Sequence, residues 1–355
     1  MPASAHLARL GAVSRATGSR EIADARGYCA GVLGDLGFSV AEHPFEFSAF
    51  AGRWAASVAG LLIPSLATLI VLASYSRVLW IVAGAVLFAL WLLVGRWSSG
   101  RGVLDAPVLR QRGVNLEAIR GTEPRVWLVA HLDSKWQPVP MIARVAGVLT
   151  LGVSLIALAV AFFIAPPAVP WLLMLTWLGA TPLILSVVGA RNHGTLDNAS
   201  GVAAVLGAAA LVEPSHSLGV LITDAEELAL AGARAWASEG RIRPTVAINC
   251  DTVDDDGPLV LMYTGSRPAR VISALEAAAS SSAEKVRALH LIPGILTDSI
   301  ALAARGWESV TLSRGTLRTL QRIHTSRDTL ATMSGKGIEG AAMVLARAAT
   351  GGKLG

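Results

Sequence analysis

Two adjacent carboxylates, Glu226 and Glu227, follow an apolar run at residues 218–222. If this run is a buried strand, the pair lies at its C-terminal end, where open α/β sheets place their reactive groups. Neighbouring side chains on a turning backbone point in different directions. One carboxylate can therefore bind a metal ion while the other acts as a base. The alternative is a solvated first turn of a helix, where acidic residues are also favoured.

Further residues of metal-binding type lie at the ends of other predicted strands or in loops beside helices: His131, Asp197, Asp251 and His324. Two histidines with several carboxylates suit zinc, and zinc pairs about 3.5–4 Å apart are common in hydrolases. Such a pair needs one bridging carboxylate and a free carboxylate that accepts a proton from water. Singly, each residue has an ordinary alternative, since His131 can be a core histidine and Asp197 a helix N-cap.

Five motifs resemble those of the M28 family of zinc peptidases, also called the aminopeptidase Y family. They are His131-Leu132-Asp133-Ser134, Asp197-Asn198-Ala199-Ser200-Gly201, Ala225-Glu226-Glu227-Leu228, Asn249-Cys250-Asp251 and His324-Thr325-Ser326-Arg327-Asp328. Weaker similarities are Gly18-Ser19-Arg20 and Thr297-Asp298-Ser299. The resemblance covers the chain except for two long uncharged segments.

The resemblance implies an aminopeptidase that holds two zinc ions per chain and acts on a peptide substrate. The implied zinc ligands are His131 and Asp251 on one ion, Glu227 and His324 on the other, and Asp197 bridging both. Glu226 would be the general base. Asp133 would orient His131, because a ligating histidine usually donates its other N–H to a carboxylate.

Two departures from the family pattern bear on these roles. The residue before Asp197 is Leu196, where such proteins often carry a further acidic residue. His131 and Asp197 are 66 positions apart (197 − 131), since an uncharged segment lies between them. Two other functions stay open. One is a cyclase of the same family that uses one zinc to close N-terminal glutamine, and the other is a non-catalytic membrane scaffold with a relict peptidase domain.

Strands and helices alternate along the charged parts of the chain. Strands are expected near residues 38–47, 115–119, 126–130, 218–222, 246–250 and 310–312. Helices are expected near residues 20–36, 198–210, 228–238, 268–280, 299–305 and 337–348. This alternation indicates an α/β fold with a mostly parallel mixed sheet. With the resemblance, it becomes a three-layer zinc-peptidase sandwich of the phosphorylase/hydrolase-like type.

Two segments without charged residues interrupt this pattern. Residues 54–76 and 78–95, on either side of Arg77, form the first, and residues 145–190, divided by a proline-rich stretch, form the second. Each half is long enough to cross a hydrocarbon core of roughly 30 Å. We therefore expect two transmembrane hairpins with four transmembrane helices, and a lipid bilayer as a partner.

The hairpins define the expected domains. Residues 1–53, 96–144 and 191–355 form the peptidase-like domain, residues 54–95 the first hairpin and residues 145–190 the second. Arginines are frequent in residues 1–53 and 96–144, whereas the loops on the opposite side hold only Arg77. The positive-inside rule then predicts a multi-pass protein of the cell membrane with its peptidase-like domain in the cytoplasm.

The composition agrees with a membrane protein. Hydrophobic residues make up 53% of the 355 residues and charged residues 15%, which is too apolar for an ordinary soluble domain. The net charge of +5 is spread along the chain without any nucleic-acid-binding motif, so no nucleic-acid partner is expected. Cys29 and Cys250 form no metal-type spacing. The acidic stretch at residues 254–256 is predicted to be a solvated loop.

Overall fold

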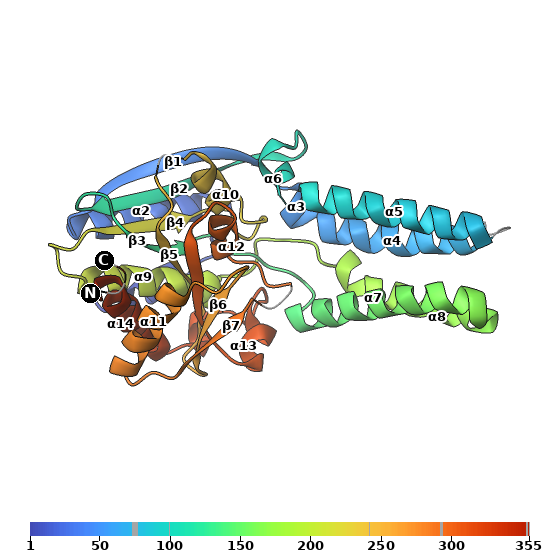
Figure 1. Ribbon diagram of the computed structural model, residues 1–355. Coiled ribbons are helices and arrows are strands. Elements are labelled where there is room, and N and C mark those ends of the chain that lie inside the picture. Colours follow the sequence, from blue (N-terminus) through green and yellow to red (C-terminus); the bar gives the residue numbers. More distant parts are fainter. Residues whose placement is uncertain (73–76, 99, 241, 292–293, 353, 355) are drawn as a thin grey trace. The chain divides into compact units, whose positions relative to one another are not determined.

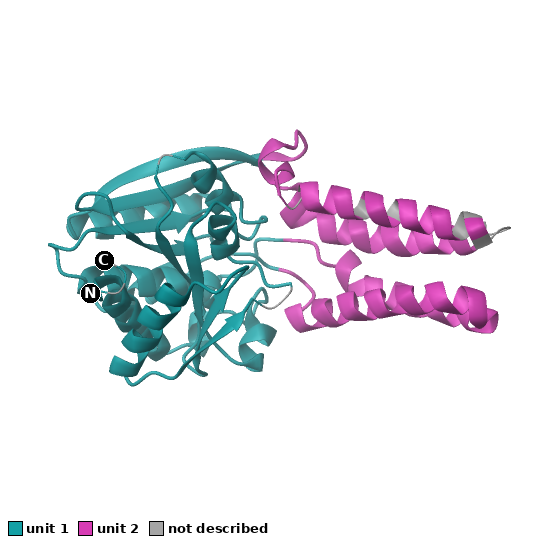
Figure 2. Cartoon of the chain, viewed as in Figure 1, with its two compact units in different colours: residues 1–47, 111–136, 189–355 teal, residues 48–110, 137–188 magenta. Residues whose placement is uncertain are grey.

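The computed structural model describes residues 1–72, 77–98, 100–240, 242–291, 294–352 and 354 (Figure 1). Contacts divide the described chain into two compact units, each made of several segments (Figure 2). Unit 1 consists of residues 1–47, 111–136 and 189–355, and unit 2 of residues 48–110 and 137–188. Unit 2 thus contains the two uncharged segments together with the short stretches that flank them.

The described part of unit 1 is built on an eight-stranded mixed sheet with the order β1-β2-β4-β3-β5-β8-β6-β7. The strands are β1 (Ser39–Ser48), β2 (Arg110–Arg120), β3 (Val126–His131), β4 (Leu218–Thr223), β5 (Val246–Val253), β6 (Leu259–Tyr263), β7 (Val286–His290) and β8 (Glu308–Arg314). The central strands β4, β3, β5 and β8 are parallel, whereas β2 and β6 run antiparallel to β4 and β8.

Alternate side chains of the central strands enter two hydrophobic layers, because successive residues of a strand point to opposite faces. Leu128 and Ala130 of β3 belong to the larger core, and Trp127 and Val129 pack on the other face with Trp236. The larger core is covered by α1 (Ala3–Leu10), α2 (Arg20–Asp35), α9 (Ser200–Leu211), α11 (Ala269–Ser281) and α14 (Lys336–Thr350). The opposite face carries α10 (Ala231–Ser238) and α12 (Asp298–Ala303), which completes three layers (Figure 1).

The predicted α/β fold with a mixed sheet is confirmed, with differences in individual elements. β6, β7, α1 and α13 (Leu317–Arg322) were not among the expected elements. The helix expected at residues 228–238 begins only at Ala231. Ala229 and Leu230 have φ values of 72° and 60°, and a right-handed helix cannot include this left-handed conformation.

In the acidic stretch after β5, Asp256 is exposed as the sequence suggested, but Asp254 and Asp255 are not simply solvated. Asp254 is buried, accepts a hydrogen bond from Thr319 Oγ1 at 2.7 Å and pairs with Arg322 at 3.2 Å. Asp255 accepts a hydrogen bond from the backbone N–H of Gly337 at 3.1 Å, in the first turn of α14. These carboxylates therefore tie the end of β5 to α13 and α14, and the sequence prediction was wrong for both.

The α-helices described in unit 2 are α3 (Phe50–Arg53), α4 (Ala55–Leu72), α5 (Arg77–Ser98), α6 (Gly102–Asp105), α7 (Met141–Ile164) and α8 (Val169–Ile184). Three helical segments of the described residues are long and apolar enough to cross a membrane: Ala55–Leu72, Met141–Ile164 and Pro166–Ile184. The fourth predicted span, residues 78–95, falls in α5, where several side chains lie outside the described structure. Three candidate spans are therefore supported.

Glycines bring the helices of unit 2 into close contact. A Cβ atom on Gly179 of α8 would lie 2.6 Å from the backbone nitrogen of Leu151 in α7, and one on Gly60 of α4 would lie 2.9 Å from the nitrogen of Ile184. Trp177 Nε1 of α8 also donates a hydrogen bond at 3.1 Å to a threonine hydroxyl of α4. Close backbone approach at small residues is how helices associate in a membrane.

Candidate metal centre

The residues that the sequence singled out for chemistry lie together at one edge of the sheet. They are His131, Asp133, Asp197, Glu226, Glu227, Asp251 and His324. Strands β3, β4 and β5 are parallel neighbours, so their C-terminal ends meet at this edge. The remaining positions are the turn Thr195–Ala199 before α9 and the segment after α13.

One group of candidate ligands consists of His131, Glu226 and Asp251, whose ligand atoms lie within 4.8 Å of one another. His131 Nε2 is 3.7 Å from Asp251 Oδ1 and 3.9 Å from Glu226 Oε2. All three side chains are buried. Thr252 Oγ1 donates a hydrogen bond to Asp251 Oδ1 at 3.0 Å, which fixes the orientation of that carboxylate.

A second group consists of Asp197, Glu227 and His324, again with ligand atoms within 4.8 Å of one another. His324 Nε2 is 2.9 Å from Asp197 Oδ2 and 3.0 Å from Glu227 Oε1. The other oxygen of Asp197, Oδ1, is 3.1 Å from Nε2 of His131 in the first group. Asp197 therefore turns one oxygen to each histidine, as a bridging ligand does.

The buried oxygen atoms of Glu226 and Glu227 show whether the site fits a metal ion. Glu226 Oε1 is buried and has no hydrogen-bond partner among the described residues, and Glu227 Oε1 is a buried oxygen 3.0 Å from His324 Nε2. An unpaired buried polar group costs about 1–3 kcal/mol, and more when it is charged. A cation between the carboxylates and the histidine nitrogens would satisfy these atoms, and nitrogen and oxygen donors of this kind bind zinc. The donor set fits a metal centre.

Burial and neighbouring charges separate the pKa values of these groups. Burial raises the pKa of Glu226 well above its usual range, and the nearby Glu227 carboxylate adds to the effect. Burial acts in the same direction on Asp197, but the two flanking histidines outweigh it and hold the pKa of Asp197 below its usual range. The pKa of His131 is raised because its carboxylate neighbours outweigh burial. The metal-free site thus holds protons that a bound cation displaces.

Asp133 lies against His131, its predicted partner, and also contacts the loop that carries the two glutamates. His131 Nδ1 is 3.1 Å from the backbone oxygen of Asp133 and 3.5 Å from its carboxylate. The Asp133 carboxylate also accepts hydrogen bonds from the backbone N–H groups of Glu226, at 3.0 Å, and Glu227, at 3.1 Å. Asp133 thus connects the loop after β3 to the loop after β4.

Two further side chains hold the turn that carries Asp197. Asp328 accepts hydrogen bonds from the backbone N–H groups of Leu196, at 2.6 Å, and Asp197, at 3.2 Å. Asn198 Nδ2 donates to the carbonyl of Cys250 at 2.9 Å, beside the ligand position on β5. The turn is therefore fixed from two sides, and the leucine in place of an acidic residue contributes its backbone N–H.

Left-handed backbone conformations cluster around the centre. Ala225 (φ 58°) precedes the two glutamates, Thr252 (φ 58°) follows Asp251, and His324 itself has a φ of 61°. Non-glycine residues adopt this conformation at a cost of order 1–3 kcal/mol each, and they cluster at functional sites. The surrounding hydrogen bonds hold these residues in place.

Arg15 is a buried residue of this region that the sequence analysis missed. Its guanidinium donates to the carbonyls of Leu132, at 2.9 Å, His193, at 2.7 Å, and Gly194, at 2.8 Å. It therefore links the loop after β3 to the turn before α9. Arg20, which the sequence singled out, has a side chain that is 90% exposed. The partners of Arg15 are backbone carbonyls of distant segments, which no local pattern reveals.

Asp298 and Lys135 also lie close to the candidate ligands. Asp298 is buried at the start of α12 and accepts a hydrogen bond from the hydroxyl of Thr223, and burial raises the pKa of Asp298 to about 7. Its sequence signal was the weak Thr297-Asp298-Ser299 similarity. Lys135 Nζ is 2.5 Å from Glu227 Oε2. Lys135 follows the first motif directly, but nothing in its local sequence marks it as part of the site.

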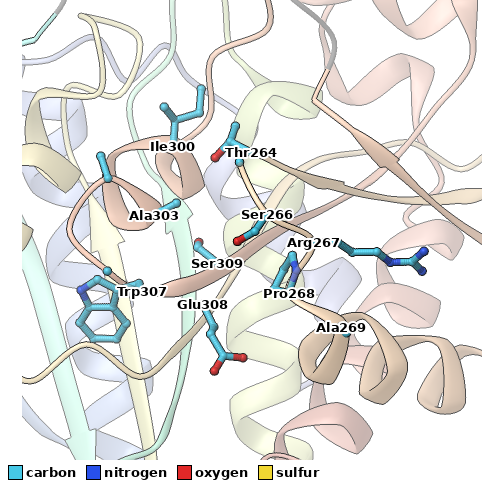
Figure 3. A pocket seen from close by; sticks show the side chains of 13 residues that line it. Thr264, Ser266, Arg267, Pro268, Ala269, Ile300, Ala303, Trp307, Glu308 and Ser309 are labelled. Atoms are coloured by element: carbon cyan, nitrogen blue, oxygen red, sulfur yellow. The ribbon is translucent and has the colours of Figure 1, made fainter.

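A cavity of about 710 Å³ lies elsewhere in unit 1 (Figure 3). Its lining consists of residues 264–269, Ile300, Ala303, Ala304 and residues 306–309. None of the candidate metal ligands is among these residues, so the cavity is a separate feature from the metal centre.

Two histidines and several carboxylates thus gather where the parallel strands of the mixed sheet end. The sequence profile of peptidase family M28 matches residues 116–349, and the chain belongs to this family of zinc-dependent peptidases. The resemblance inferred from the motifs is confirmed. Membership supports a hydrolase and leaves the individual reaction open. No curated protein matches the sequence.

Solved structures share the fold at low sequence identity. An aminopeptidase from Aneurinibacillus sp. is 13% identical with a TM-score of 0.57, over 98% of this chain and 92% of its own. A glutaminyl cyclase from Fimbriiglobus ruber is 14% identical with a TM-score of 0.58, over 99% and 94%. A Zn-dependent exopeptidase from Parabacteroides distasonis is 13% identical with a TM-score of 0.57, over 98% and 96%. The similarity establishes the fold of this chain, and peptidases and glutaminyl cyclases both have this fold.

Proposed function

We propose that this protein is a membrane-anchored metallopeptidase with two zinc ions per chain that removes N-terminal residues from peptides. The observation that carries the proposal is the position of Asp197, whose two oxygens lie 3.1 Å and 2.9 Å from the two histidines. A carboxylate between two ligand groups is what a two-metal hydrolytic site requires. The proposed ligands are His131, Asp197 and Asp251 for one ion, and Asp197, Glu227 and His324 for the other.

Glu226 has the properties of a general base in this arrangement. When bound, zinc ions polarise the scissile carbonyl and make a water molecule more acidic. Glu226 Oε1 is buried without a hydrogen-bond partner among the described residues, so it is available to accept the proton of that water. The water oxygen bonds to the carbonyl carbon, the C–N bond breaks, and Glu226 passes the proton to the leaving amine. Asp133 keeps the Glu226 backbone in place during these transfers.

A second function is favoured by the structural neighbours, several of which are glutaminyl cyclases, such as those from Fimbriiglobus ruber and Bacteroides thetaiotaomicron. The group Asp197, Glu227 and His324 is a complete three-ligand site by itself. One zinc there would suffice for a cyclase that releases ammonia from N-terminal glutamine. A second set of ligands, His131 and Asp251 with the shared Asp197, favours the two-zinc peptidase.

Metal stoichiometry and substrate assays on the detergent-purified chain test these functions. We expect two zinc ions per chain in wild type and in Glu226→Gln, and a loss of metal in His324→Ala. Wild type should hydrolyse aminoacyl-4-nitroanilides, and Glu226→Gln should be slower by roughly 10²–10⁴-fold, as for loss of a general base. One zinc with ammonia release from glutaminyl peptides would indicate the cyclase. If the chain holds no metal tightly, even after zinc is supplied, only the non-catalytic membrane scaffold remains as a function.

We also propose that unit 2 anchors the chain in the cell membrane as a multi-pass protein with unit 1 in the cytoplasm. Three candidate spans support the anchoring, and the arginine-rich flanking stretches support the cytoplasmic orientation. Both natural cysteines are buried, so a cysteine introduced by Ser280→Cys, at an exposed position, reports topology with little background. Labelling by an impermeant maleimide is expected only after cells are permeabilised. Labelling in intact cells would reverse the orientation.

A further inference from the structure

The two groups of candidate ligands differ in their cationic neighbours. Lys135 Nζ is 2.5 Å from Glu227 Oε2, and the two side chains are 13% and 6% exposed. Glu227 Oε1 meanwhile faces His324 Nε2 at 3.0 Å. The ammonium of Lys135 therefore pairs with Glu227 Oε2, whereas Oε1 faces the proposed metal position beside His324. Only the Glu227 carboxylate separates the ammonium from that position.

The backbone fixes Lys135 at this place. Asn192 Nδ2 donates a hydrogen bond to the Lys135 carbonyl at 3.0 Å. The next residue, Trp136, exchanges two backbone hydrogen bonds with Gly189, at 3.0 Å and 2.8 Å. These bonds close the point where the chain leaves unit 1 for residues 137–188 and returns to it. Lys135 is thus held on a short, well-bonded segment that leads its side chain to Glu227.

The other group has no comparable neighbour. Among the described residues, the ion pairs of Glu226 and Asp251 are both with His131. Neither carboxylate there is paired with a lysine or an arginine among the described residues, whereas the ammonium of Lys135 offsets the charge of Glu227. Asp197 is shared by both groups, so it does not alter the difference. A divalent cation is attracted by net negative charge and repelled by a nearby ammonium, more strongly in a buried site than in water.

We propose that Lys135 makes the two metal sites unequal. The first divalent cation binds to His131, Asp251 and Asp197, and the second binds more weakly to Asp197, Glu227 and His324. Lys135 also holds Glu227 so that only one oxygen faces the metal, which limits this ligand to a single bond. The inference rests on the proposed two-metal function and adds the order in which the sites fill.

Zinc titration of the metal-free, full-length chain in detergent, in competition with a chromophoric chelator, tests this order. Wild type should show two binding steps of different affinity. His324→Ala should remove the weaker step and Asp251→Asn the tighter one. Lys135→Met should strengthen the weaker step by about tenfold or more, which corresponds to about 1.4 kcal/mol, and leave the tighter step within about twofold.

Matched variants separate charge from geometry. Lys135→Arg keeps the positive charge and should retain the two unequal steps. Lys135→Gln removes the charge but retains a hydrogen-bond donor for Glu227 Oε2, so it should also strengthen the weaker step, and it replaces Lys135→Met if that variant does not fold. Lys285→Met makes the same change in net charge at an exposed position of unit 1 and should match wild type.

The outcomes distinguish this inference from the function it rests on. Absence of zinc binding in wild type would overturn the two-metal function itself. If wild type shows two steps and Lys135→Met and Lys135→Gln leave them unchanged, the role of Lys135 alone is overturned. The same holds if these variants weaken the weaker step further. Loss of the weaker step in Asp251→Asn in place of His324→Ala would reverse the assigned order.

Discussion

The carboxylate of Asp133 accepts a hydrogen bond from the backbone N–H of Glu226 at 3.0 Å. The other oxygen of Asp133 accepts the N–H of the next residue, Glu227, at 3.1 Å. One side chain after β3 therefore orients both glutamates after β4, although 93 residues separate Asp133 from Glu226. The proposed base and a candidate metal ligand are held by the same carboxylate.

Replacing Asp133 with asparagine tests this link. One asparagine oxygen can still accept an N–H group, but the amide nitrogen then faces the second N–H group, donor against donor. Leaving a buried N–H unpaired costs about 1–3 kcal/mol, and changes in residues that support ligands typically lower metal affinity by about 10–100-fold. We expect Asp133→Asn to show both effects by thermal unfolding and zinc titration. An unchanged zinc affinity would contradict the positioning role.

A methyl group at Gly201 should disturb the turn that carries Asp197. A Cβ atom there would collide with the side-chain oxygen of Asn198 and the carbonyl of Cys250. Overpacking of this kind costs about 1–3 kcal/mol. We expect Gly201→Ala to lower both the thermal midpoint and zinc binding, because the turn and β5 are forced apart.

The control for this change is Gly27→Ala on the exposed face of α2, where a Cβ atom meets nothing within 4 Å. Alanine is preferred to glycine in a helix interior by roughly 0.5–1 kcal/mol, so Gly27→Ala should raise the thermal midpoint without affecting zinc. If Gly201→Ala behaved like Gly27→Ala, the close packing around the turn would not matter for the site.

The sequence located part of the site from strand ends, whereas Asp197 and His324, in a turn and a loop, were found by the resemblance of their motifs to those of family M28. Apolar runs that stop at His131, Glu226 or Asp251 place these side chains at one edge once the strands are parallel neighbours. Lys135 and Arg15 could not be found in this way, because their contacts are with Glu227 and with backbone carbonyls far along the chain. Such contacts exist only in the folded chain.

The same distinction explains the errors in the fold. β6 is a short apolar run and β7 a half-exposed one at the sheet edge, and short runs do not separate strands from other structures. The acidic stretch after β5 looked solvated because charge usually means exposure, but Asp254 pairs with Arg322 from α13, which was not predicted. The local sequence pattern was enough to predict the central strands. The edge strands and the burial of Asp254 depend on contacts between distant segments.

Asp224 makes the stability of the metal-free protein depend on pH. Burial, followed by the nearby Asp133 charge, raises the pKa of Asp224 to about 7, against roughly 3.9 in an unfolded chain. Between these values the unfolded chain releases the proton while the folded chain keeps it, so stability falls as pH rises from about 4 to about 7. Below about pH 4 both states are protonated, and above about pH 7 the loss is complete.

Asp224→Asn removes this titration and keeps an oxygen that can accept the N–H of Val114, which Asp224 now accepts at 3.1 Å. The variant and wild type should have the same thermal midpoint near pH 4, and the midpoint of the variant should become increasingly higher up to pH 7. At pH 7 the unfolding free energy of the variant should exceed that of wild type by on the order of 2–4 kcal/mol. Asp24→Asn, at an exposed position of α2, serves as the control. A difference that shrank as pH rose would contradict the assignment.

Gly179 tests whether helix packing stabilises unit 2. A Cβ atom at this position would lie 2.6 Å from the backbone nitrogen of Leu151, so a leucine forces α7 and α8 apart. Helix association in a membrane depends on close packing at small residues, since lipid tails are as apolar as leucine. Gly179→Leu should therefore unfold at lower temperature in detergent and become more sensitive to protease between these helices.

Gly152→Leu on α7, where a Cβ atom meets nothing within 4 Å, should resemble wild type. Equal behaviour of the two variants would mean that the contact between α7 and α8 contributes little to stability.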